Sequence, residues 1–144
     1  MPTQSDPAAP IAADARPWPS AWVRAALEPA ILGALMGGPL HGYGIAQALA
    51  ARGFGTLRGG SLYPVLARLE EAGHVSTRWV EGQGGPGRKD YALTDAGRAA
   101  YADAVASFRA LGAALAALGA EGESGPNDGT AESVPAPVPQ EVAR

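Results

Sequence analysis

Residues 59–79, which read GGSLYPVLARLEEAGHVSTRW, constrain the fold more than any other stretch of the chain. Four apolar side chains recur there at spacings of three and four, the pattern of one buried face on a short helix. They are Leu62, Val65, Leu66 and Leu69. We expect Ser61 to cap this helix, Pro64 to occupy its third position and Gly73 to end it. The fold must therefore accommodate a short helix that leads directly into an extended segment.

The face of this helix opposite the apolar stripe carries small and polar side chains, which can approach another surface. They are Ser61, Pro64, Ala67, Arg68 and Glu71. Arg68 can contact a nucleic acid, or it can pair with Glu70 or Glu71 on its own helix. Tyr63 can likewise contact a nucleic acid or pack half-buried with its hydroxyl hydrogen-bonded. The sequence leaves both alternatives open.

Two segments after the short helix alternate in the two-residue period of half-buried strands. The first, VSTRWV, places Val75, Thr77 and Trp79 on one face, and the second is KDYAL. The link between them, EGQGGPGR, is rich in glycine, and Arg88 and Lys89 stand at its exit. We expect a hairpin with a mobile, basic tip.

The residues before the short helix predict further helices. A first helical stretch capped by Ser20 breaks at Pro29, and an apolar helix begins there and ends at a Gly-Gly pair. A third stretch covers residues 40–53. Gly42 and Gly44 weaken its first turn, so we expect the backbone to pack closely against a neighbour there.

The last predicted helix begins after Thr94, which can cap it. Six apolar side chains follow at steps of three and four, which is a heptad-like seam. They are Tyr101, Val105, Phe108, Leu111, Leu115 and Leu118. Such a seam favours pairing with a second copy of the helix, so we expect a homodimer. Packing of the seam on its own domain is the alternative.

Composition divides the chain into a folded middle and two polar ends. Residues 1–19 and 119–144 are rich in proline, glycine and alanine, with too little bulky apolar content to offset the entropy of ordering. We expect both ends to be disordered. Residues 52–109 carry eight basic and six acidic side chains, although the whole chain has a net charge of −3. We see no apolar run near the ~20 residues of a membrane span and expect a cytoplasmic protein.

These elements predict a mainly α (α+β) fold, a winged helix-turn-helix with a two-stranded wing and a long C-terminal dimerisation helix. Residues 20–93 would form the DNA-binding domain and residues 94–118 the dimerisation helix. A short helix with a small, polar outer face fits the DNA major groove, about 12 Å wide, while the hairpin reaches the neighbouring backbone. A winged helix that binds a protein instead is the alternative. The basic side chains of Arg68, Arg88 and Lys89 favour DNA.

The sequence lacks the residue patterns that are typical of an enzyme active site or a metal site. It has no cysteine and no nucleophile motif, so we expect neither enzymatic activity nor a cofactor. His41 and His74 lack the accompanying carboxylates or thiolates of a metal site, so we expect no bound metal.

Three motifs, in this order and at this spacing, resemble the PadR family of bacterial transcriptional regulators, in its short form with a single C-terminal helix. They are GPLHGYGI at 38–45, GGSLYPVLARLEEAGHV at 59–75 and GGPGRKDYALTDAGR at 84–98. The resemblance covers about residues 27–118. It implies a homodimer that binds a DNA operator, often as a repressor of a neighbouring gene. A small aromatic or drug-like effector, or another signal, would release this homodimer from DNA.

The resemblance also implies roles for particular residues. The DNA contacts that it implies in the helix-turn-helix and the wing are Tyr43, Ser61, Tyr63, Pro64, Arg68, Arg88 and Lys89. A dimer centre lined by Trp22, Tyr101 and Phe108 could hold a flat apolar effector. The chain departs from the family at Asp90, where an aromatic or basic residue is common, and its last helix lacks the tryptophan on which some members stack ligands.

Overall fold

The computed structural model describes residues 17–123. Its contacts separate the chain into two units, Met1–Ser107 and Phe108–Arg144. The first unit contains the sheet and most of the helices, and the described part of the second is helical. The disorder predicted for the two ends falls largely on residues 1–16 and 124–144, which lie outside the described residues.

Within the described part of the first unit, four helices and one 3-10 turn precede the hairpin. Their bounds are Ser20–Ala25 for α1, Leu27–Ala34 for α2, Leu35–Gly37 for the 3-10 turn η1, Gly42–Ala50 for α3 and Gly59–Glu71 for α4. Pro29 lies in the first turn of α2, where its missing N–H costs no helical hydrogen bond. The predicted break in the helix next to Pro29 is therefore confirmed.

The sheet of the first unit has three antiparallel strands. In their order across the sheet, the strands are β1 (Leu40–His41), β3 (Arg88–Leu93) and β2 (Val75–Val80). The sequence predicted two strands and placed Leu40 and His41 in a helix, which is wrong. β1 forms because Leu40 pairs with Tyr91 and His41 with Asp90. A two-residue strand has no periodicity of its own, so no local pattern predicts it.

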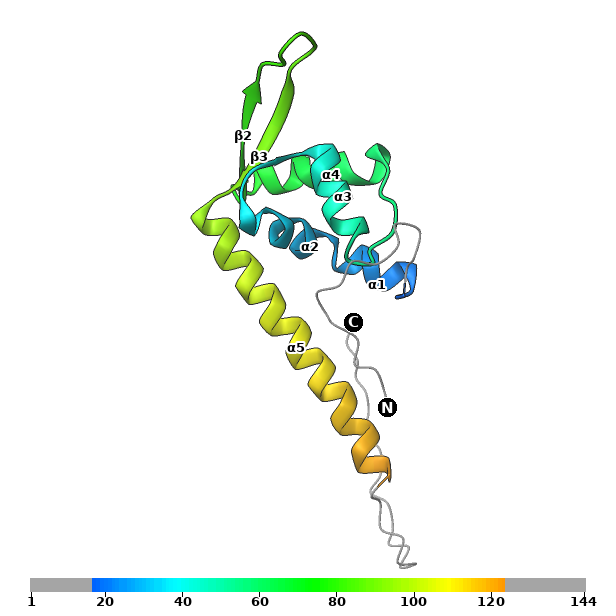
Figure 1. The fold of residues 1–144 in the computed structure, drawn as a ribbon. Coiled ribbons are helices and arrows are strands. Elements are labelled where there is room, and N and C mark those ends of the chain that lie inside the picture. The colour runs from blue at the N-terminus through cyan, green and yellow to red at the C-terminus, as the bar shows by residue number, and fades with distance from the viewer. Residues whose placement is uncertain (1–16, 124–144) are drawn as a thin grey trace, which may run out of the picture. The chain divides into compact units, whose positions relative to one another are not determined.

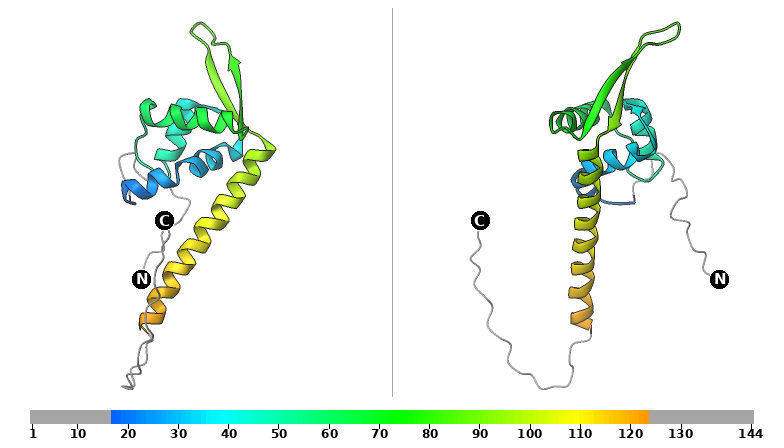
Figure 2. Two further views of the ribbon diagram at one scale, coloured as in Figure 1. Left: turned by 180° about the vertical axis from the view of Figure 1, so that it is seen from behind. Right: turned by 90° about the vertical axis from the view of Figure 1, so that its left-hand side faces the viewer.

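Strands β2 and β3 form the predicted hairpin, and it projects past the helices of the first unit as a wing (Figures 1 and 2). The cross-strand partners on one face are Val75 and Leu93, Thr77 and Tyr91, Trp79 and Lys89. The two-residue alternation predicted this face correctly. The strands are joined by residues 81–87, which turn at Gly84 with a φ of 75°.

The apolar stripe of α4 is buried as predicted. Its four members are packed with side chains from the other helices and the sheet, namely Leu27, Ile31, Leu32, Leu35, Ile45, Leu49, Val75 and Tyr91. Gly73 ends α4 with a φ of 80°, and the N–H of His74 donates to the carbonyl of Leu69 at 2.9 Å. The core thus holds α4 by one face and leaves the other at the surface.

The start of α4 differs from the prediction. The helix begins at Gly59, and the carbonyl of Arg58 accepts the N–H groups of Ser61 and Leu62, each at 2.9 Å. Ser61 is therefore inside the first turn and does not cap the helix. Pro64 lies in the second turn, where its ring removes the hydrogen bond that would reach Gly60.

The last helix, α5, spans Asp95–Glu123 and runs past the end that the sequence predicted at residue 118. The predicted cap is confirmed, because the Thr94 hydroxyl oxygen accepts the N–H of Gly97 at 3.0 Å. A Cβ at Gly97 would collide with the carbonyl oxygen of His74. Glycine at this position lets the start of α5 lie against the start of the wing.

The length and composition of α5 correct one expectation. An 18-residue window within α5 has a mean hydropathy of 1.3. By length and composition alone, the helix is long and apolar enough to cross a membrane. The expectation that no run of this length exists is therefore wrong. One such helix is weak support for a membrane protein, because a seam that pairs with another helix has the same composition.

Candidate nucleic-acid interface

The outer face of α4 and the adjoining end of α3 form the first part of the candidate interface. Tyr43, Ser61, Tyr63 and Pro64 are all exposed there. Tyr43 stands on α3 with 66% of its surface exposed, and Tyr63 stands on α4 with 49% exposed. These residues project from two helices that contact one another within one rigid core. Their side chains can thus reach a partner while their backbones stay fixed.

Tyr63 joins the two helices through Gly42. A Cβ at Gly42 would overlap the hydroxyl oxygen of Tyr63, so the tyrosine side chain lies directly on the glycine backbone. The close approach predicted for Gly42 is confirmed. At Gly44 the nearest atoms belong to Leu40 and His41 of the adjacent turn, so this glycine serves a local contact. Tyr63 therefore packs on α3 and is still half exposed, so its packing does not prevent the proposed contact with DNA.

We expect Gly42→Ala to lower the free energy of unfolding by about 1 kcal/mol, because the new methyl group displaces the Tyr63 ring. In a Tyr63→Ala background the same substitution should be neutral or stabilising, since alanine favours a helix. Gly60→Ala is the matched control, because its Cβ meets nothing within 4 Å. Urea denaturation measures all four variants. Equal losses with and without the Tyr63 side chain would contradict this contact.

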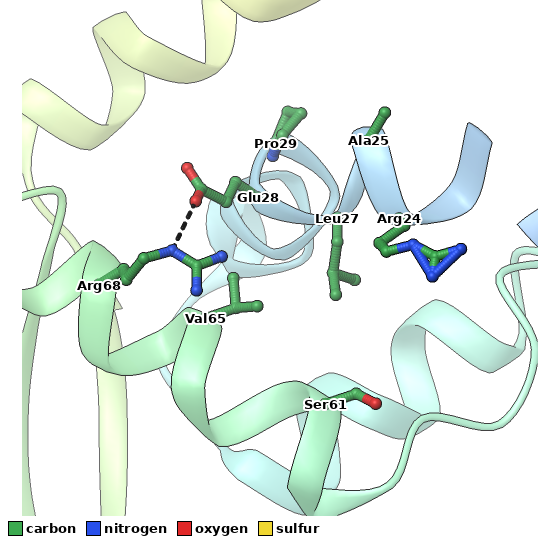
Figure 3. A pocket seen from close by; sticks show the side chains of 8 residues that line it. All are labelled: Arg24, Ala25, Leu27, Glu28, Pro29, Ser61, Val65 and Arg68. Carbon is green, nitrogen blue, oxygen red and sulfur yellow. Dashed lines mark hydrogen bonds and ion pairs between the residues drawn. The ribbon is translucent and has the colours of Figure 1, made fainter. Parts of the chain in front are cut away.

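Arg68 is already engaged in the free protein. Its Nε lies 3.2 Å from Oε2 of Glu28, which is on α2, as the dashed line in Figure 3 shows. The sequence offered Glu70 and Glu71 as partners, and neither is correct. Both side chains are about half exposed, so the pair stabilises the fold by at most about 1 kcal/mol. Arg68 thus links α4 to α2, and a DNA contact would compete with Glu28.

A pocket of about 360 Å³ lies beside this ion pair, between α1, α2 and α4 (Figure 3). Its lining residues are Arg24, Ala25, Leu27, Glu28, Pro29, Ser61, Val65 and Arg68. None of the predicted effector residues lines it. Trp22 is exposed on α1, and Tyr101 lies against Gly33 of α2.

The wing forms the second part of the candidate interface. Arg88 and Lys89 lie within β3, although the sequence placed them at the exit of a mobile tip. Nε of Arg88 is 3.1 Å from Oδ1 of Asp90, and Nζ of Lys89 is 3.6 Å from Oε1 of Glu70 on α4. The pairing of Arg88 explains how the chain accommodates the unusual Asp90. Both cations therefore have a carboxylate partner that partly neutralises them before any DNA is bound.

Sequence reasoning missed two further cations of this region. Arg58 immediately precedes α4, and Arg78 lies on β2 opposite Asp90. Both are exposed, and neither forms an ion pair with another residue of the described range 17–123. The Gly-Gly pair after Arg58 could have indicated that the helix begins there, with Arg58 at its N-terminus. The choice of Ser61 as the cap placed the helix start too late and left Arg58 outside it.

One tyrosine at the base of the wing has a shifted pKa. Burial raises the pKa of Tyr91, and the nearby Tyr63 and Glu70 raise it further because their negative charges oppose ionisation. The Lys89 ammonium also lies 5.7 Å from the centre of the Tyr91 ring. Tyr91 therefore stays protonated at neutral pH and acts as part of the core.

Helices α3 and α4 pack on one core, and the hairpin of β2 and β3, with its basic side chains, lies beside the exposed face of α4. This arrangement defines a winged helix-turn-helix protein. The model of the transcriptional regulator PadR-like family matches residues 31–103. Since this match spans half of the chain, the protein belongs to the PadR-like family of transcriptional regulators. Family members are regulators, so the expectation that the protein is not an enzyme is confirmed.

Solved structures of the same family share this fold. A PadR-like transcription factor from Bacteroides fragilis has 31% identity and a TM-score of 0.60, over 69% of this chain and 95% of that one. A PadR family regulator from Eggerthella lenta DSM 2243 has 28% identity and a TM-score of 0.63, over 68% and 85%. Bacillus subtilis PadR in complex with operator DNA has 31% identity and a TM-score of 0.51, over 55% and 45%. No curated protein matches the chain.

Proposed function

We propose that this PadR-family protein binds a DNA operator as a homodimer and represses transcription until a small aromatic effector releases it. The observation that carries the proposal is the exposed outer face of α4 beside an ordered basic wing. The similarity to Bacillus subtilis PadR, whose structure contains operator DNA, supports the same assignment. Such a regulator works where the chromosome is, so we propose a cytoplasmic location.

In this proposal the two parts of the interface have different tasks. Tyr43, Ser61, Tyr63 and Pro64 approach base edges in the major groove, because they stand on helices that the core holds rigidly. Arg88 and Lys89 bind backbone phosphates, which supplies affinity and little sequence choice. Residues 20–93 then act as the DNA-binding domain.

The homodimer is proposed to form through α5, with residues 94–118 as its principal segment. In the second unit the side chains of Leu111, Leu115 and Leu118 are 55%, 62% and 66% exposed. Apolar side chains at heptad-like spacing with this exposure need a partner in water. Tyr101 was assigned to the same seam, but it packs on Gly33 in its own chain. This contact holds the start of α5 to α2 and supports Tyr101 as the point where the seam begins.

The proposed effector is a flat aromatic molecule held at the centre of the dimer, with Trp22, Tyr101 and Phe108 as its candidate contacts. Trp22 and Phe108 are exposed aromatic side chains, so both are free to contact a ligand. Tyr101 is half-buried against α2 and could contribute an edge of such a site.

Sequencing the genomic DNA that the purified protein retains tests the proposal. We expect a shared sequence with two related half-sites, because a symmetric dimer reads its operator twice. Fluorescence anisotropy then compares this sequence with a scrambled duplex, with and without aromatic ligands. If no sequence is enriched and both duplexes bind equally weakly, the winged helix serves protein binding instead.

A further inference from the structure

Glu70, near the end of α4, contacts both strands of the wing. The hydroxyl of Thr77 on β2 donates to Oε2 of Glu70 at 3.0 Å. Nζ of Lys89 on β3 lies 3.6 Å from Oε1 of the same carboxylate. Each carboxylate oxygen therefore engages a different strand. No other residue of the described chain, 17–123, makes side-chain hydrogen bonds or ion pairs from α4 to both strands.

The contacts of Glu70 lie where they can determine the angle between the wing and α4. Val75 and Tyr91 are buried and fix the base of the hairpin to the core. Beyond them most wing side chains are exposed, so few contacts determine its angle to α4. Thr77 lies beside Tyr91 in the register, and Lys89 lies two pairs further out, opposite Trp79. Glu70 thus holds the hairpin where it leaves the core.

The same contacts also affect the charge that DNA meets. Lys89 is the wing's only lysine, and Glu70 partly neutralises it in the free protein. A phosphate that binds Lys89 must compete with this carboxylate, and the carboxylate repels the phosphate. Glu70 therefore opposes binding to DNA of any sequence while it holds the wing in place.

We propose that Glu70 is a positioning residue that fixes the wing to α4 and thereby sets operator selectivity. The proposal rests on the DNA-binding function proposed above. A wing at a fixed angle fits its phosphates best when α4 is seated in its correct bases, so helix and wing bind most strongly together on the operator. A loose wing adapts to any duplex, which favours scrambled DNA and weakens the discrimination.

Three single substitutions separate position from charge. Glu70→Gln keeps the shape and an acceptor for Thr77 but releases Lys89. Thr77→Val removes the hydroxyl and changes no charge. Glu71→Gln is the matched control, because Glu71 is exposed and makes no hydrogen bond or ion pair within the described residues.

We expect the ratio of operator to scrambled affinity to fall about fivefold in Glu70→Gln and in Thr77→Val, the effect of about one hydrogen bond. In Glu70→Gln the ratio should fall because scrambled DNA binds more tightly once the carboxylate charge is gone. In Thr77→Val the charge is unchanged, so the ratio should fall because the operator binds more weakly. Glu71→Gln should leave the ratio unchanged. Anisotropy titrations on both duplexes measure these ratios, and thermal unfolding confirms that each variant is folded.

A second measurement follows the wing without DNA. Trp79 on β2 reports wing motion when Trp18→Phe and Trp22→Phe leave it as the sole tryptophan. Its time-resolved anisotropy should show larger local motion in Glu70→Gln and not in Glu71→Gln. Unchanged motion, or an equal gain in affinity for both duplexes in both glutamine variants, would overturn the proposal. If the unaltered protein binds no DNA, the proposed function fails, and Trp79 still shows whether Glu70 holds the wing.

Discussion

A chain that ends at Ser107 is expected to be a folded monomer, and the full chain is expected to be a dimer. The cut follows the boundary between the two units and removes Phe108, Leu111, Leu115 and Leu118 together. It keeps Tyr101 on Gly33, so the core of the first unit remains covered. Analytical ultracentrifugation measures the two masses. Operator affinity should fall at least about 100-fold, because two linked half-site contacts become independent.

Point substitutions provide a matched control for this truncation. Leu111→Asp with Leu115→Asp places two charges in the seam and should also give a monomer. Ala113→Asp lies on the opposite side of the helix by its spacing and should leave the dimer intact. A dimer that survives both the truncation and the double substitution would show that the interface lies elsewhere. If α5 crossed a membrane instead, the full chain would require detergent to remain in solution.

Elements with a local pattern were predictable from the sequence. The stripe that includes Leu62 and Leu69 follows from spacing along one helix, and the face of the hairpin that includes Thr77 follows from strict alternation. The Thr94 cap is equally local, since its acceptor and donor are three residues apart. In each case the residues that specify the element are close neighbours in the chain.

Contacts between distant residues were not predictable in this way. Arg68 pairs with Glu28, which is 40 residues away, although two glutamates are closer in sequence. The strand at Leu40 exists because Tyr91 lies beside it in the sheet. Spacing shows which face of a helix is polar, but the packing of helices decides which partner each polar side chain finds. The polar residues on the outer face of α4 were therefore correctly predicted to be exposed. The ion-pair partner of Arg68 was not predicted.

Replacing Arg88 and Lys89 with alanine should weaken binding to every DNA sequence. In the proposed function both side chains act as charges on phosphates, so affinity should fall for the operator and for scrambled DNA. In a dimer that contacts four phosphates through these residues, the slope of log affinity against log salt should fall by up to about 3.6, from ~0.9 per phosphate. Because each cation already has a carboxylate partner, the measured change should lie below that limit. Anisotropy across a salt series measures both slopes.

Arg68→Ala is expected to lower the selectivity for the operator rather than the affinity for all DNA, since Arg68 stands on the rigid α4. If it reads a base, its loss should cost about 1–3 kcal/mol per contact and narrow the gap between operator and scrambled DNA. Glu28→Gln distinguishes this role from bracing α4 against α2, because it breaks the same ion pair and leaves the guanidinium free. A base-reading Arg68 predicts that Glu28→Gln keeps or increases selectivity. Equal losses of selectivity in Arg68→Ala and Glu28→Gln would show that Arg68 acts by holding α4 in place, and the bases would then be read by the residues around Tyr63.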